Sequence, residues 1–179
     1  MSLDFDIGPS SNPTVESSSP YSVNIFSGGG YQAVQTSSNY IWFDFNSNNP
    51  NGFNFHVRSE NEGLYSATAN ALIPSEDEDL STDSNNNGGY GIKIFNENNT
   101  QETLGPLIKS TNYDTSGANY VGAVSNLNKL IFSTNDTGSN RGEILNGRGA
   151  IILKAKTRIT TPVAGDYSDE LFFTIVGDF

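Results

Sequence analysis

Apolar and polar residues alternate over short stretches of this chain, and clusters of Asn, Gly and Ser separate one stretch from the next. A period of two places every second side chain on the same face of an extended strand. No stretch keeps the apolar spacing of a helix beyond two turns, although residues 67–73 are also compatible with one short helix. The alternation predicts strands at residues 21–26, 31–35, 40–45, 53–57, 64–73, 90–95, 104–109, 120–124, 130–133, 150–159 and 167–176.

The clearest alternation lies near the end of the chain. Residues 150–159 place Ile151, Leu153 and Ala155 on one face and basic residues on the other, which predicts a strand with one buried face. The closing stretch does the same with Tyr167, Leu171, Phe173 and Ile175. Pro and Gly between the two stretches predict a hairpin or a crossing between sheets. Many short strands separated by turns predict an all-β fold, a two-sheet immunoglobulin-like β-sandwich, with the last two strands expected to form an edge hairpin.

The first residues differ in kind from the rest of the chain. Leu3, Phe5 and Ile7 alternate with acidic residues, and a stretch rich in Pro and Ser follows. This pattern predicts a short amphipathic strand on a polar tether over residues 1–20. The remainder, residues 21–179, is expected to form a single β-sandwich domain.

Composition narrows the classes of function. The net charge of −11 argues against nucleic acid and anionic membrane surfaces as partners. The absence of cysteine excludes disulfides and thiolate chemistry. No apolar run approaches the roughly 20 residues that cross a bilayer, so no membrane insertion is expected. Few Lys and Arg among abundant Asn, Thr, Ser and Gly are typical of exported bacterial proteins, which predicts a secreted or cell-surface location.

Catalytic motifs are scarce. His56 is the only histidine, and its place in an alternating stretch predicts a rim position on a strand. No Gly-x-Ser-x-Gly motif is present, and the glycines at 28–30 lack the Lys of a phosphate loop. Asp166 and Asp169 are a carboxylate pair of the type that glycosidases use, although capping a turn is the commoner role. We therefore expect a protein that is not an enzyme.

An acidic run at residues 75–89 is a candidate calcium site. Glu76, Asp77, Asp79 and Asp83 offer hard oxygen ligands, of which calcium takes six to eight. The spacing does not match an EF-hand loop. The alternative is a solvated charged loop without a metal.

Tyr40 and Trp42 are candidates for carbohydrate binding, because exposed aromatic rings stack on sugars. The alternative is that the single tryptophan fills the core of the sandwich.

Charge is distributed unevenly along the chain. Asp4 and Asp6 lie in the first strand, whereas five of the nine basic residues lie in the last third: Arg141, Arg148, Lys154, Lys156 and Arg158. A negative first strand and a positive late strand would suit head-to-tail pairing between copies. The alternative is ordinary solvated charge on an exposed strand face.

Three segments resemble the spore coat protein U domain, which is also the fold of subunits of archaic chaperone–usher pili. Residues 164–176 (AGDYSDELFFTIV) look like the closing strand of that family, and residues 147–159 are similar to the strand before it. Residues 90–95 (YGIKIF), followed by Gly105, resemble a central strand.

The resemblance implies an incomplete immunoglobulin-like sandwich that the N-terminal strand of the next subunit completes. In this chain the exchanged strand would insert Leu3, Phe5 and Ile7. The alternative is an ordinary edge strand that pairs within its own chain and completes the sandwich there. The expected function is that of a non-catalytic exported surface or fimbrial-type structural subunit or adhesin, whose partners are further copies or other surface subunits. The alternative is a calcium-assisted carbohydrate-binding module.

Overall fold

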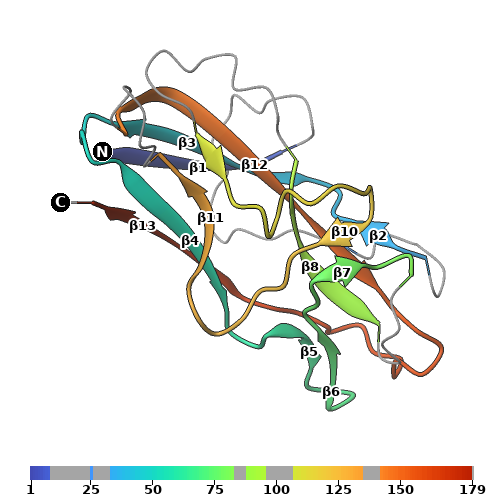
Figure 1. Ribbon diagram of the computed structural model, residues 1–179. Helices are drawn as coiled ribbons and strands as arrows, with labels where there is room; N and C mark the ends of the chain where they lie inside the picture. Colours follow the sequence, from blue (N-terminus) through green and yellow to red (C-terminus); the bar gives the residue numbers. More distant parts are fainter. Residues whose placement is uncertain (9–24, 26–32, 83–87, 96–106, 135–141, 179) are drawn as a thin grey trace.

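A computed structural model describes residues 1–8, 25, 33–82, 88–95, 107–134 and 142–178 of the chain (Figure 1). The described residues form strands and turns and contain no helix, so the expected all-β fold is confirmed. No helix in the described ranges is therefore long and apolar enough to cross a membrane. The strands are β1 (Ser2–Gly8), β2 (Gln35–Thr36), β3 (Tyr40–Ser47), β4 (Phe53–Ser59), β5 (Gly63–Ser66), β6 (Ala71–Pro74), β7 (Glu78–Asp79), β8 (Gly89–Ile94), β9 (Ile108–Lys109), β10 (Tyr120–Val121), β11 (Lys129–Ser133), β12 (Ile144–Lys156) and β13 (Leu171–Gly177).

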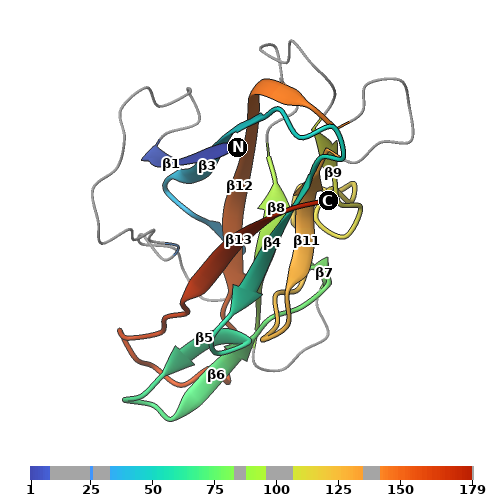
Figure 2. The same ribbon diagram turned by 90° about the vertical axis from the view of Figure 1, so that its left-hand side faces the viewer.

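Two antiparallel sheets form the layers of the molecule (Figures 1 and 2). The first, sheet A, has the order β1-β3-β12, and the long β12 then pairs with both β2 and β8. The second, sheet B, has the order β13-β4-β11-β9. Two small pairs, β5–β6 and β7–β10, extend from these layers. This arrangement is a β-sandwich, and its immunoglobulin-like character stays a prediction.

Phenylalanines of β3 and β4 fill the space between the sheets. Phe43 of sheet A meets Phe55 of sheet B edge-on at 4.7 Å between ring centroids. One step further along, Phe45 lies 5.1 Å from Phe53. All four rings are fully buried. They occupy alternate positions in each strand, because a period of two sends every second side chain to the same face.

A short turn joins these two strands and carries the chain from one sheet to the other. Gly52 has a φ of 82°, which a side chain would disfavour, and its N–H donates to the carbonyl of Asn49 at 3.0 Å. The side-chain amide of Asn49 also donates to the backbone carbonyl of Asp178 at 2.6 Å. The turn is therefore tied to the residue that follows the last strand.

The long strand β12 departs from the predicted one-sided burial. Ile151, Leu153 and Ala155 face the core as expected. On the opposite face, however, Lys154 and Lys156 are 7% and 5% exposed. Both faces are buried because other parts of the chain cover the outer one, for example the carbonyl of Leu80, to which Lys156 Nζ donates at 2.7 Å. The solvated face expected for these two lysines is thus wrong.

Several other predictions can be compared with the strands. Residues 64–73 form the hairpin β5–β6 with a turn at 67–70, so the helix alternative is wrong there. The last two strands lie in different sheets, so the crossing is confirmed and the expected edge hairpin is wrong. The predicted strand at 21–26, apart from residue 25, lies outside the described residues, as do residues 31–32 and 104–106 of two other predicted strands.

Replacing Phe55 by Ala tests how far the sandwich depends on its aromatic core. Phe55 is fully buried and lies within 5.8 Å, centroid to centroid, of Phe43, Phe45 and Phe173. We expect the substitution to lower the free energy of unfolding by about 3–5 kcal/mol, measured by urea titration. As a control, Phe172→Ala removes an outward-facing, half-exposed ring and should cost about 1 kcal/mol. Equal losses in the two variants would contradict this description of the core.

Candidate functional site

The first strand lies on the edge of sheet A within its own chain. All of β1 pairs with β3 in an unbroken antiparallel register, from Ser2 opposite Asn46 to Gly8 opposite Tyr40. Phe5 lies opposite Phe43, so the apolar side chains of β1 share the inner face of the sheet. Leu3 and Phe5 are half-buried and pack on the core. The predicted amphipathic strand is confirmed, whereas its exchange between copies stays a prediction.

The edges of the two sheets meet where β1 faces β13 across the sandwich, and we call this edge the β1–β13 seam. Phe5 lies 5.6 Å from Phe43 in its own sheet and 6.1 Å from Phe173 in the other sheet. The seam consists of half-buried apolar residues that pack on the core: Leu3, Phe5, Tyr167, Leu171, Phe173 and Ile175. The first strand and the last strand of the described chain thus supply its two walls.

The outer edge of β13 is open in the part of the chain that the structure describes. β13 pairs only with β4, and in an antiparallel pair every second residue forms backbone hydrogen bonds to the partner strand. The even-numbered residues do so here: the carbonyl of Glu170 accepts from the N–H of Glu60, and the N–H of Asp178 donates to the carbonyl of Gly52. The backbone groups of Phe173 and Ile175 therefore point to the open side. The strand contains no Lys, Pro or bulge, the features that usually protect an edge.

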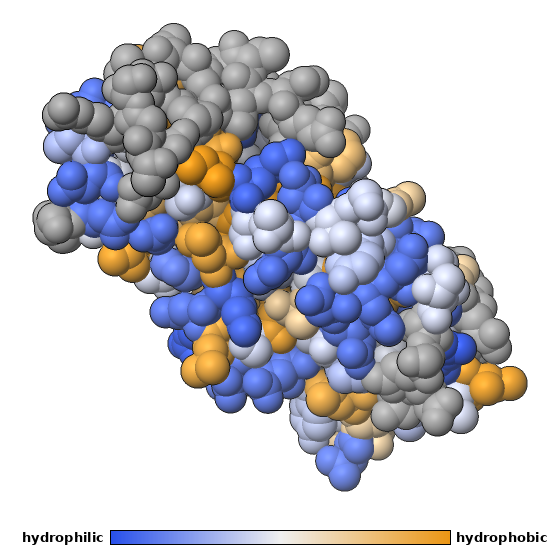
Figure 3. Space-filling model, viewed as in Figure 1, coloured by the Kyte–Doolittle hydropathy of each residue, from blue (hydrophilic) through white to orange (hydrophobic). Residues whose placement is uncertain are grey.

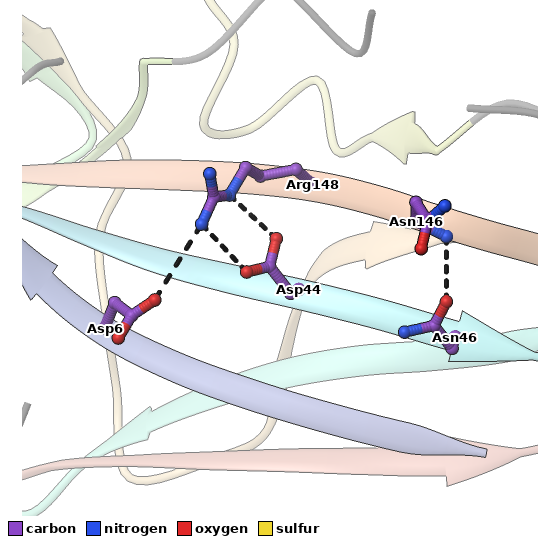
Figure 4. A network of polar contacts seen from close by, with 5 residues as sticks. All are labelled: Asp6, Asp44, Asn46, Asn146 and Arg148. Atoms are coloured by element: carbon purple, nitrogen blue, oxygen red, sulfur yellow. Dashed lines mark hydrogen bonds and ion pairs between the residues drawn. The ribbon is translucent and has the colours of Figure 1, made fainter. Parts of the chain in front are cut away.

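An ion-pair cluster joins β1 to the two neighbouring strands on the outer face of sheet A (Figure 4). Arg148 of β12 binds Asp44 of β3 in a bidentate manner, with Nε at 2.7 Å from Oδ1 and Nη2 at 2.8 Å from Oδ2. The same Nη2 lies 3.8 Å from Oδ2 of Asp6, which is only 6% exposed. We call these three residues the Arg148 cluster. The acidic first strand and the basic late strand thus interact within one chain, whereas the sequence suggested pairing between copies.

The indole ring of Trp42 supports the Arg148 cluster. The Arg148 guanidinium carbon lies 5.1 Å from the centroid of this ring, and Trp42 is directly opposite Asp6 in the strand register. Trp42 is 4% exposed, so its faces are not available as a sugar-stacking platform. Trp42 is buried on the outer face of sheet A. The alternative that placed it in the core between the sheets is therefore wrong. Tyr40 is half-buried and stacks on Phe95 at 4.1 Å.

Burial determines the electrostatics of Asp44. Partial removal from water raises the pKa of its carboxyl group, and the Arg148 charge and hydrogen bond oppose this shift without cancelling it. The nearby charges of Asp6 and Asp4 raise the pKa further. Two carboxylates, those of Asp44 and Asp6, therefore share one guanidinium, and the cluster keeps a net negative charge.

The acidic run does not gather into a metal site in the described residues. No group of three or more His, Cys, Asp or Glu side chains in these ranges lies close enough to hold a metal ion. The Asp79 carboxylate instead accepts from the backbone and the hydroxyl of Ser81, at 2.9 and 2.6 Å. Asp83 lies outside the described residues, and so calcium binding that includes it stays untested.

The remaining polar candidates have local partners. His56 is half-buried on the outer face of β4, as its alternation predicts. Asp166 accepts hydrogen bonds from the Ser66 hydroxyl and the Thr68 N–H, and these bonds lower its pKa to about 2. Asp169 accepts from the Ser59 hydroxyl at 2.8 Å. Both aspartates thus fasten the loop before β13 to the strands beside it.

Sequence reasoning missed Asp44 and the pair formed by Asn46 and Asn146. The side chain of Asn46 accepts from the backbone N–H of Asn146 at 2.8 Å, beside the Arg148 cluster (Figure 4). The available signal was Asp44 itself, a lone acid on the polar side of the apolar stretch YIWFDFN. A charge at such a position needs a partner, and a basic residue on an adjacent strand is the natural one.

Comparison with known proteins gives no match: no family model, no curated protein and no solved structure is similar to this chain.

Replacing Asp44 by Asn tests the electrostatics of the Arg148 cluster. Since folding raises the pKa of Asp44, the folded protein binds a proton there more tightly than the unfolded chain does. The penalty for its charge is therefore present at neutral pH and is relieved as the pH falls through the raised pKa. The stability of the wild type relative to Asp44→Asn should rise between about pH 7 and pH 4, measured by urea unfolding. The opposite slope would mean that the ion pair with Arg148 outweighs burial.

Proposed function

We propose that this chain is a non-catalytic structural subunit, of the exported bacterial surface or fimbrial type, that associates with copies of itself by exchange of β1. The observation that carries the proposal is the position of β1. Among the described strands it is the outermost of sheet A, and the contacts described for it with β3, β13 and β12 are made by residues Ser2–Gly8. The β1 of another copy would make the same contacts.

The energetic balance between the two arrangements favours neither strongly. The described contacts of β1, which are the backbone ladder with β3, the burial of Leu3 and Phe5 and the ion pair of Asp6, would form equally when β1 comes from a neighbour. The difference lies in the entropy of the connecting segment and in protein concentration. Residues 9–24 separate β1 from Ile25, which is buried in the core, and a segment of this length spans at most about 55 Å. Exchange is therefore within reach of an adjacent copy.

The Arg148 cluster would give the exchanged strand its register. Shifting β1 by one residue would turn Asp6 toward the apolar seam and Phe5 toward the guanidinium. A buried carboxylate without its cation is costly, and so only one register satisfies both faces of the strand. The cluster thus selects β1, rather than any apolar segment, for this edge.

No observation in the described ranges favours the alternative, a calcium-assisted carbohydrate-binding module. Trp42 is buried, and the carboxylates of the acidic run that the structure describes do not converge. On the face that Figure 3 shows, several small hydrophobic areas lie among hydrophilic residues.

Removing residues 1–8 tests the exchange. We expect the full-length protein to form multimers whose fraction rises with concentration, measured by size exclusion with light scattering. The truncated protein should remain monomeric and should bind a synthetic peptide of residues 1–8.

Arg148→Met in the truncated protein should weaken that binding about tenfold or more, because Asp6 loses its cation. Arg58→Met is the matched control, since Arg58 stacks on Phe172 in the other sheet. A full-length protein that stays monomeric at every concentration, with no peptide binding by the truncated form, would refute the proposal.

A lysine on the open edge of β13 tests whether this edge contributes to association. Ile175 is half-buried in the seam, and its backbone groups point to the open side. Ile175→Lys should cost about 1–2 kcal/mol of stability, because a long side chain can direct its charge to solvent. It should also reduce any association that persists after β1 is removed, seen as less light scattering on concentration. Unchanged scattering would show that the edge plays no part.

A further inference from the structure

Two lysines lie next to each other on the outer face of sheet A, at the end away from the Arg148 cluster. In the β8–β12 register Lys93 is opposite Ile152, and Lys154 is opposite Gly91. The lysines are therefore diagonal neighbours on adjacent strands, roughly 7–8 Å apart at the backbone, a separation that long side chains bridge. The charge of Lys93 and burial both lower the pKa of Lys154, with burial as the larger cause.

Both ammonium groups have neutral partners only. Lys154 Nζ donates to the hydroxyl oxygen of Thr36 on β2 at 2.7 Å. Lys93 Nζ donates to the carbonyl of Thr115, also at 2.7 Å. Ion pairs with carboxylates in the described ranges involve Lys109 and Arg148, and neither Lys93 nor Lys154 takes part in one.

The absence of a carboxylate partner for Lys154 among the described residues is unusual in this chain. Twenty acidic residues against nine basic ones give the sequence an excess of carboxylates. Lys154 is nevertheless 7% exposed with a single neutral acceptor, an arrangement that is costly for an ammonium ion. Each ammonium group has three N–H donors, of which the described contacts use one.

The remaining N–H donors of the two lysines and their access to solvent determine which kind of ligand could bind here. Thr36 accepts from Lys154 and keeps its own O–H for donation, and it is exposed to solvent, while Lys93 is half-buried. The pair of charges with an adjacent hydroxyl suits a ligand that is negative and accepts several hydrogen bonds. An oxyanion group meets both conditions.

We propose that Lys93, Lys154 and Thr36 form a binding site for the oxyanion group of a small ligand, a carboxylate, sulfate or phosphate. The proposal is independent of strand exchange, because these residues do not contact β1. Binding would supply negative charge beside Lys154, whereas Lys93 already interacts electrostatically with Asp79.

Thermal unfolding in matched salts tests the site. The full-length protein is heated in sodium acetate, sulfate or phosphate, with sodium chloride holding the ionic strength constant. We expect at least one oxyanion to raise the Tm in a saturable manner at millimolar concentration. Sulfate and phosphate also stabilise proteins generally, so the readout is the difference between the wild type and variants in the same salt. The anion with the largest difference identifies the chemical class of the ligand.

Three variants locate the effect. Lys154→Met and Lys93→Met should each remove the saturable part of the shift, and Lys154→Met should also raise the Tm in chloride alone. Lys109→Met is the matched control, because Lys109 already pairs with Asp114 at 3.0 Å, and it should retain the full shift. Should Lys154→Met fail to fold, Lys93→Met alone decides. An equal shift in all variants, or no saturable shift in the wild type, would overturn the proposal.

Discussion

The contact between the phenylalanines of β3 and β4 is the constraint on which the rest of the fold depends. Five residues separate the two strands, so Phe43 and Phe45 can meet Phe53 and Phe55 only if both alternations stay in phase through the turn. Gly52 makes this turn possible, and the Asn49 side chain fixes it to the end of the last strand. Because the chain passes from one sheet to the other here, the two strands define both layers of the sandwich.

The seam follows directly from this central pair. β1 occupies the free edge of β3, and β13 occupies the free edge of β4, so the two ends of the chain face each other beside the phenylalanine core. The half-buried state of Phe5 and Phe173 indicates that the seam is less completely packed than the core it borders. Apolar burial therefore gives β1 moderate affinity for its edge, and the Asp6–Arg148 contact adds selectivity.

Residue patterns predicted the parts of this structure that depend on one strand and its own alternation. The inner faces of β1, β3, β4 and β12 follow from positions such as Phe5, Phe43 and Ile151, because a period of two assigns faces without knowledge of neighbours. The outer faces were not predictable in this way. A polar position such as Lys154 looks the same in sequence whether solvent or another segment covers it. Asp44 was missed for the same reason, since its partner lies on a strand about a hundred residues away.

The two ends of β12 solve the problem of charge on a covered sheet face differently. At one end Arg148 pairs with two carboxylates, and the pKa of Asp44 is raised mainly by burial and further by the nearby charges of Asp6 and Asp4. At the other end Lys154 has a lowered pKa, neutral partners and a second lysine as its neighbour. A net charge of −11 describes neither place, because the local sums have opposite signs. The two ends should therefore respond separately. Protonation of Asp44 would remove a negative charge from the Arg148 cluster, whereas a bound anion would offset the positive charge of the two lysines. Association through β1 and occupation of the lysine pair are thus expected to respond to different solution conditions although one strand carries both.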